Sequence, residues 1–246
     1  MNNNTFDEVA LREALKKDFI EPPEMGALGT MLREQFTTVA VRKDDTQPFG
    51  KNNRERVKAV AMVAPTQTGK STLIEQALAE LEPIEATDGT KVEPKPIIVE
   101  CPSTFTTVGL AREIIVRLRY DVRSMPADAL HNRIREVAVP LFKPTHLVLD
   151  EFQRVFNPSG VSEPRKAEVA KAVLGDLRRL MDLSSWPVAL VLVGTEDLLS
   201  HLQNPLFKSF LERIQAIMEL EPLVLAPDEF DRLRQVIAAY CATAKD

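Results

Sequence analysis

The segment from Ala64 to Ser71 has the residue types and spacing of a loop that binds phosphate groups. Its letters, APTQTGKS, match the pattern G-x-x-x-x-G-K-[ST] except that Ala64 replaces the first glycine. In such a loop the backbone N–H groups and the following helix N-terminus point at a phosphate. Lys70 would reach the β- and γ-phosphates, and the Ser71 hydroxyl would bind Mg²⁺. The segment therefore predicts a site for ATP and Mg²⁺.

Nine consecutive residues are expected to line this nucleotide site. They are Ala64, Pro65, Thr66, Gln67, Thr68, Gly69, Lys70, Ser71 and Thr72. Ala64 fits the first position only if its φ is negative, because alanine rarely adopts the positive φ that glycine accepts. A Gly-Lys-Ser at a helix start can also occur by chance, but the apolar run before it and the helical pattern after it favour the phosphate-binding interpretation.

A second group of candidate residues begins 80 residues after Lys70, at the end of an apolar run. His146 to Leu149 is followed by two acids, Asp150 and Glu151. Asp150 would complete the Mg²⁺ shell, and Glu151 would orient and deprotonate an attacking water. The alternative is a solvated strand end, which the upstream phosphate loop makes less attractive.

Two further polar residues follow or precede apolar runs near the end of the chain. Thr195 follows the run from Val188 to Val193, where it could sense the γ-phosphate or position water. Thr195 could equally cap the next helix. Arg213 precedes the last apolar run and could act in trans as an arginine finger, which implies an oligomer. The alternatives are a surface arginine paired with an acid, or a finger at Arg178 or Arg179.

Basic and hydroxyl side chains gather between residues 103 and 135. Six arginines fall between Arg112 and Arg135, directly after a loop rich in Ser and Thr. Such side chains could contact nucleic-acid phosphates, although a charge run is more often only a solvated helix face.

The elements that must position these residues alternate between short apolar runs and helical patterns. Apolar runs occur at 57–63, 97–99, 147–149, 188–193 and 217–220, and helical patterns at 69–82, 106–120, 127–139 and 164–182. Unalternating runs between helices are typical of a parallel sheet covered on both faces. We therefore expect an α/β fold. Residues 1–50 are expected to form a helical extension (helices near 5–18 and 24–40), residues 51–225 the core, and residues 226–246 the start of a reduced or truncated helical lid.

Composition excludes several other classes of protein. The 246 residues carry 31 Lys and Arg against 36 Asp and Glu, a net charge of −5, so any nucleic-acid contact must be local. The three histidines and two cysteines follow no metal or redox spacing. No apolar run approaches the ~18 residues of a membrane span, and the start is no signal peptide, so a cytoplasmic protein without a membrane partner is expected.

Taken together, these motifs resemble the AAA+ ATPases, and within them the TniB/TnsC regulators of bacterial DNA transposition. The order matches Walker A, Walker B (Asp150-Glu151), sensor 1 (Thr195) and a candidate arginine finger (Arg213). The resemblance covers roughly residues 30–225. It also rests on Glu100-Cys101-Pro102, Leu110 to Ile115, Arg119-Tyr120, Leu149 to Arg154, Leu192 to Glu196 and Leu211 to Gln215.

This resemblance implies an ATP-bound ring or helical filament on double-stranded DNA. It also implies contacts with a transposase and with a TniQ-like target-selection protein. The residues that it places against DNA are Thr104, Thr106, Thr107, Arg119 and Arg123. A sensor 2 arginine cannot be assigned. The alternatives are another ATPase of DNA metabolism, such as a helicase loader or origin-binding protein, and an ATP-binding scaffold with little hydrolysis.

Overall fold

A computed structural model describes the greater part of the chain. The described residues are 24–44, 46, 47, 50, 52–86, 89–103, 106–120 and 126–220. The helices predicted near residues 5–18 and after Asp228 lie outside them, as do Thr104 and Arg123.

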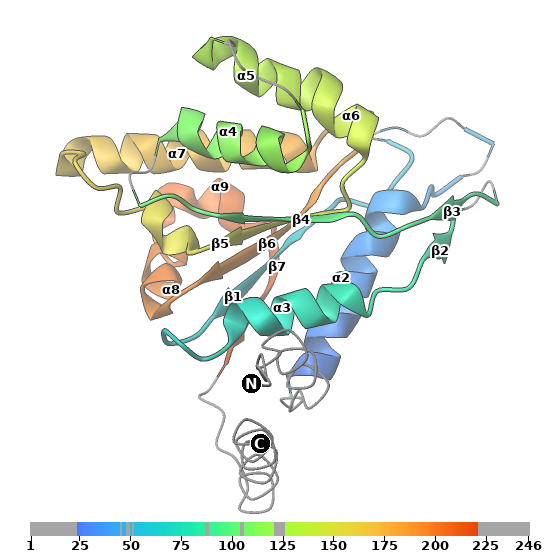
Figure 1. Ribbon diagram of the computed structural model, residues 1–246, viewed down its shortest axis with the longest axis horizontal. Helices are drawn as coiled ribbons and strands as arrows, with labels where there is room; N and C mark the ends of the chain where they lie inside the picture. The colour runs from blue at the N-terminus through green and yellow to red at the C-terminus, as the bar shows by residue number, and fades with distance from the viewer. Residues whose placement is uncertain are drawn as a thin grey trace, which may run out of the picture. The chain divides into compact units, whose positions relative to one another are not determined.

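Five parallel strands form the central sheet. Their order across the sheet is β4 (Pro96–Glu100), β5 (His146–Asp150), β6 (Ala189–Gly194), β1 (Ala59–Val63) and β7 (Ile214–Glu219) (Figure 1). Every residue of β1 and β6 is buried, because helices cover both faces. The predicted α/β fold is confirmed, and all five predicted strands are present.

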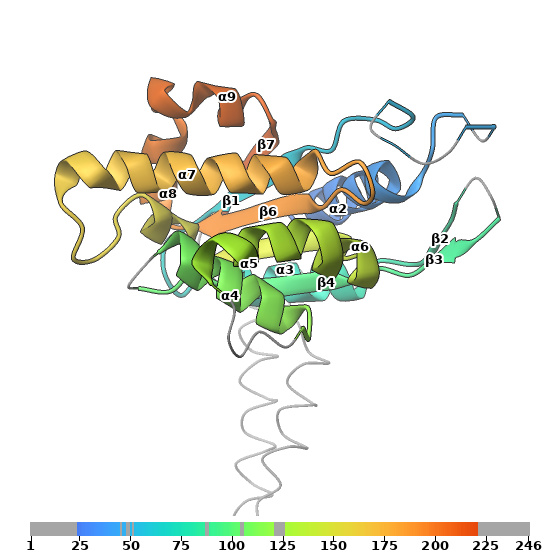
Figure 2. The same cartoon turned by 90° about the horizontal axis from the view of Figure 1, so that it is seen from above.

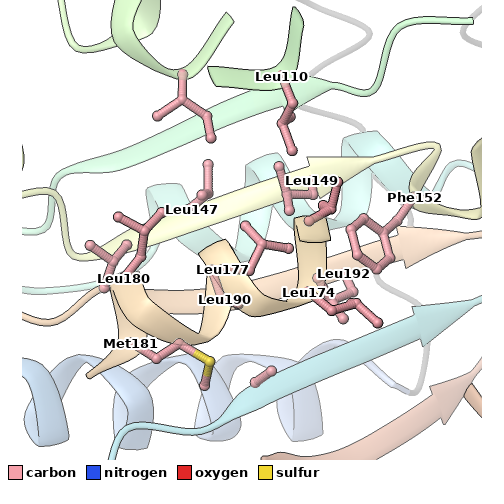
Figure 3. Packing of buried hydrophobic residues seen from close by; sticks show 14 of the residues in the cluster. Leu110, Leu147, Leu149, Phe152, Leu174, Leu177, Leu180, Met181, Leu190 and Leu192 are labelled. Atoms are coloured by element: carbon pink, nitrogen blue, oxygen red, sulfur yellow. The ribbon is translucent and has the colours of Figure 1, made fainter. Parts of the chain in front are cut away.

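Helices cover the two faces of this sheet in two groups. The face carrying α4 (Thr107–Arg117) and α7 (Glu163–Met181) lies opposite the face carrying α2 (Met25–Ala40) and α3 (Lys70–Ala79) (Figure 1). Figure 3 shows the packing between α7 and the sheet. Its side chains include Leu174, Leu177, Leu180 and Met181 from α7 and Leu147, Leu149, Leu190 and Leu192 from the strands.

The N-terminal helix α2 is an integral layer of the fold. Leu28, Leu32 and Phe36 are fully buried. The Gln35 side-chain amide donates to the carbonyl oxygens of Lys58 (2.9 Å) and Leu190 (3.1 Å). Lys58 directly precedes β1, and Leu190 lies in the neighbouring strand β6. The domain boundary expected at residue 50 stays a prediction, but α2 packs directly on the sheet.

Two local features differ from the sequence-based expectation. The helix predicted at 127–139 is α5 (Ala127–Arg133), a π-helix (Ile134–Ala138) and α6 (Val139–Phe142). The interruption fits Pro140, which has no N–H to donate to the preceding turn. A short antiparallel hairpin, β2 (Ile84–Glu85) and β3 (Lys91–Val92), was not predicted, since two-residue strands give no periodic signal.

Shorter elements complete the described fold. They are two 3₁₀ turns (Phe152–Val155 and Pro205–Phe207), α8 (Glu196–Leu202) and α9 (Lys208–Leu211). No helix among the described residues is long and apolar enough to cross a membrane.

Candidate nucleotide site and nucleic-acid interface

The predicted phosphate loop connects the buried strand β1 to helix α3. The Ala64 N–H donates to the Gly194 carbonyl (3.1 Å), which ties the loop to the end of β6. Ala64 does not have a positive φ, so the condition on this substitution is met. Gln67 (φ 64°) and Gly69 (φ 81°) adopt left-handed backbone that lets the chain turn into α3.

The side chain of Lys70 lies inside this loop. Its ammonium donates to the carbonyl oxygens of Ala64 (2.9 Å) and Pro65 (2.5 Å), and only 6% of the residue is exposed. Both acceptors belong to the loop itself, so a phosphate oxygen entering the loop can replace them. The Lys70 ammonium therefore lies against the loop, and its contact with phosphate stays a prediction.

The two predicted metal ligands are in direct contact. The Ser71 hydroxyl donates to Asp150 Oδ2 (2.6 Å), although the residues are 79 positions apart. The Glu151 N–H fixes the other oxygen, Asp150 Oδ1 (2.8 Å). One hydroxyl and one carboxylate fit Mg²⁺, which usually binds one or two protein oxygens together with phosphates and water.

Glu151, the candidate base, lies in a network that the sequence did not reveal. It follows β5 with a φ of 55°. Its carboxylate accepts from the Gln153 amide (2.9 Å) and pairs with Arg154 (3.3 Å). Arg154 also contacts Glu100 (2.8 Å) and the Cys101 carbonyl (2.6 Å), so it joins the ends of β4 and β5.

Thr195 is tied to the same network through its backbone. Its N–H donates to Gln153 Oε1 (3.3 Å). A Cβ on the preceding Gly194 would lie 2.7 Å from this Oε1 and 2.8 Å from Leu198, so only glycine fits there. Thr195 occupies the N-cap position of α8, yet its side chain makes no capping hydrogen bond. The capping interpretation therefore lacks its defining contact.

The nearest thiol is not a nucleophile in this site. Burial raises the pKa of Cys101 to about 12, against a smaller opposing effect of Arg154. Cys101 therefore stays protonated and belongs to the core.

Arg213 lies in the interior rather than on a surface that a neighbouring subunit could meet. Only 2% of its side chain is exposed, and its guanidinium donates to Asp182. Burial lowers its pKa, and Asp182 opposes this effect. The rivals are more accessible: the Arg178 side chain is 41% exposed and that of Arg179 is 64% exposed. As placed here, Arg213 would have to leave Asp182 to act as a finger.

Of the predicted DNA-contacting residues, the three that the structure describes do not lie at one point. Thr106 caps the start of α4, its hydroxyl accepting from the Gly109 N–H (2.9 Å), and Thr107 begins that helix. Exposed Arg119 follows the other end of α4 with a φ of 54°. Eleven helical residues span about 16 Å. The described threonines and Arg119 can therefore meet one ligand only if it follows the length of α4.

A parallel sheet with this loop after its β1 strand defines a P-loop nucleotide-binding protein. The chain belongs to the AAA domain family, whose model matches residues 54–202. The fold of this family of ATPases is therefore established for this chain.

Solved structures share this fold at low sequence identity. Aeropyrum pernix ORC1 in complex with DNA matches with a TM-score of 0.55 and 17% identity, covering 91% of this chain and 50% of that chain. Aeropyrum pernix ORC2 in its ADP form has a TM-score of 0.60 and 15% identity, covering 93% and 56%. Cdc6p from Pyrobaculum aerophilum has a TM-score of 0.54 and 15% identity, covering 92% and 53%.

The chain thus spans about half the length of these structures. No curated protein sequence matches it.

Proposed function

We propose that this protein hydrolyses ATP, assembles on double-stranded DNA and regulates DNA transposition. The observation that carries the ATPase part is the contact between Ser71 and Asp150, with Lys70 held in the adjoining loop. The transposition part rests on the sequence resemblance to the TniB/TnsC group.

In the proposed reaction the residues of the site divide the work between them. Lys70 neutralises charge on the β- and γ-phosphates. Ser71 and Asp150 would hold Mg²⁺, which would supply further positive charge to the phosphates. Glu151 accepts a proton from the attacking water. Gln153 and Arg154 orient its carboxylate, and Gln153 also links it to the Thr195 backbone.

A trans-acting arginine would complete this site in an oligomer. Burial makes Arg213 a poorer candidate than its sequence position suggests, and Arg178 or Arg179 is better exposed. Mixing Lys70→Ala subunits with subunits carrying Ala at one arginine tests each candidate. Restored turnover in a mixture, from two inactive proteins, identifies the residue that acts across the boundary.

The proposed DNA contact is electrostatic and depends on assembly. A chain of net charge −5 repels DNA overall, so one copy of the α4 region should bind weakly. Repeating Arg119 around a ring or filament, with Arg123 and the threonines as further predicted contacts, multiplies the phosphate contacts.

A salt titration of DNA binding with and without ATP tests this proposal. We expect ATP-dependent binding whose log–log slope is about −0.9 per neutralised phosphate. Equal, salt-insensitive binding without ATP would contradict it.

A second candidate is an origin-binding or helicase-loading ATPase. The fold similarity to archaeal ORC and Cdc6 proteins, one of them in complex with DNA, favours it. Capture of partner proteins, assayed with ATP and DNA present, separates the two functions. The transposition function requires capture of a transposase and a TniQ-like protein encoded beside this chain. The alternative requires capture of a replicative helicase.

A further inference from the structure

A cavity of about 440 Å³ lies at the end of the sheet opposite the nucleotide loop. Its walls include Lys95, which directly precedes β4, and Lys143 and Trp186, which lie in the segments leading into β5 and β6. The amino ends of parallel strands lie together at one edge of the sheet. The phosphate loop follows the carboxyl end of β1 and therefore lies at the opposite edge. In Figure 2 the hairpin β2–β3, which also lines the cavity, lies at the far end of the sheet from α8.

The charged side chains around this cavity are mostly cations. Among the described residues that line it, four are cations (Arg42, Lys91, Lys95 and Lys143) and one is an acid, Glu93. Glu93 pairs with Lys91 at 3.6 Å. The ammonium of Lys95 makes no ion pair with any residue in the described part of the chain. The described lining thus carries more positive than negative side chains, whereas the whole protein has a net charge of −5.

One wall of the cavity is formed by a buried aromatic side chain. Trp186 is only 8% exposed, and its indole N–H donates to the Pro144 carbonyl (2.8 Å). The Lys143 ammonium lies 5.4 Å from the centre of this ring. A cation near an aromatic face is attracted to it, so Trp186 holds Lys143 at the wall of the cavity.

The types of the cations and the size of the cavity indicate the ligand. Three of the four are lysines, which bind phosphate as point charges, and Arg42 adds a guanidinium fork that also matches phosphate. The hydroxyls of Thr90 and Ser185 also line the space. A volume of 440 Å³ is within the roughly 300–1,000 Å³ of ligand pockets, so it holds more than one phosphate group.

We propose that this cavity, lined by Arg42, Lys91, Lys95, Lys143 and Trp186, is a second anion site that binds consecutive phosphate groups. The phosphates belong either to a free oligophosphate or to a nucleic-acid backbone. The site is separate from the nucleotide loop, and it does not depend on the function proposed above.

The test uses the full chain carrying Lys70→Ala, which weakens phosphate binding in the nucleotide loop. Isothermal titration with tripolyphosphate in EDTA should show one saturable site per chain. Adding Lys95→Gln and Lys143→Gln should weaken binding at least tenfold. The matched control adds Lys171→Gln and Lys208→Gln, two exposed lysines outside the cavity, and should change affinity less than twofold.

A 20-base-pair duplex added as competitor distinguishes the two sources. Displacement of tripolyphosphate assigns the site to a nucleic-acid backbone, and no displacement assigns it to a free oligophosphate. Absence of saturable binding, or equal loss in the control variant, would overturn the proposal. So would binding that survives removal of Lys95 and Lys143 charge in a protein whose unfolding transition is unchanged.

Discussion

The two edges of the sheet use arginine–carboxylate pairs in opposite ways. At the carboxyl edge the Arg154 side chain is 30% exposed and bridges Glu100 and Glu151. At the amino edge Arg213 is 2% exposed and pairs with Asp182. The exposed pair adjoins the reacting groups, whereas the buried pair must offset its own desolvation. We therefore expect changes at the carboxyl edge to affect turnover and changes at the amino edge to affect stability.

The largest effect is expected at the carboxyl edge from Glu151→Gln. The amide cannot accept the proton of the attacking water, so ATP turnover should fall about 10²–10⁴-fold. ATP affinity should persist, and the assembled state should accumulate. Glu100→Gln is the matched control, because Glu100 also contacts Arg154 but is not the base. Turnover at the wild-type rate in Glu151→Gln would show that another residue is the base, or that the protein is an ATP-binding scaffold.

At the amino edge, Asp182→Asn should destabilise the protein without touching the nucleotide site. It leaves the buried Arg213 charge uncompensated, which costs about 3–5 kcal/mol in comparable pairs. Asp176→Asn is the control, since Asp176 lies on α7, whose C-cap is Asp182, and is 26% exposed against 27% for Asp182. Its partners are the exposed Arg179 and, at 3.2 Å, His131. Its cost should be at most about 1 kcal/mol. Equal losses of the free energy of unfolding in Asp182→Asn and Asp176→Asn, measured in urea, would contradict the special cost assigned to the buried Arg213 pair.

A buried histidine should make the amino edge sensitive to acid. Desolvation lowers the pKa of His146 to about 4, and its Nε2 lies 3.1 Å from the Leu32 carbonyl. The unfolded chain binds a proton near pH 6.5 and the folded chain does not. The contribution is therefore complete above pH 6.5 and is lost as the pH falls toward 4, by about 2 kcal/mol at pH 5.

This contribution can be measured as a difference between two proteins. The free energy of unfolding of the wild type should fall more between pH 7 and pH 5 than that of His146→Gln, which lacks the titrating imidazole at this position but keeps His131 and His201. Parallel pH dependences would mean that His146 is not held neutral.

The smallest effect on stability is expected from Arg154→Gln. Exposed pairs contribute about 0–1 kcal/mol, so unfolding should change little. Turnover should fall by about tenfold, because Glu151 loses a partner that orients it. Measuring both quantities on one protein sharpens the comparison with Asp182→Asn. A large loss of stability with unchanged turnover would reverse the roles assigned to the two edges.

The sequence predicted the strands and the turn from β1 into α3 correctly, for a physical reason. Apolar runs such as Val188 to Val193 must be buried on both faces, and a loop that cradles phosphate needs Gly69 and Lys70 at fixed spacing. The burial of Arg213 could not be predicted in this way. Its partner Asp182 is 31 residues distant, and nothing in the local letters reports which side chains the fold encloses.

The links made by Gln153 and Arg154 were missed for a similar reason. Each depends on contacts among the ends of β4, β5 and β6, which only the assembled sheet brings together. The glycine at 194, where a Cβ would clash with Gln153, was a local signal that could have indicated this close approach.

The most direct test compares the affinities for Mg²⁺–ATP of two variants, Lys70→Ala and Lys171→Ala. Lys171 is an exposed lysine on α7 and serves as the control. Lys70 supplies a buried cation to the phosphates, and a hydrogen bond to a charged group contributes about 1.5–3 kcal/mol. We predict that Lys70→Ala weakens binding about 10–100-fold, while Lys171→Ala binds ATP as tightly as the wild type. The unfolding transitions of both variants should match that of the wild type. Unchanged affinity in a well-folded Lys70→Ala protein would contradict the assignment of the nucleotide site.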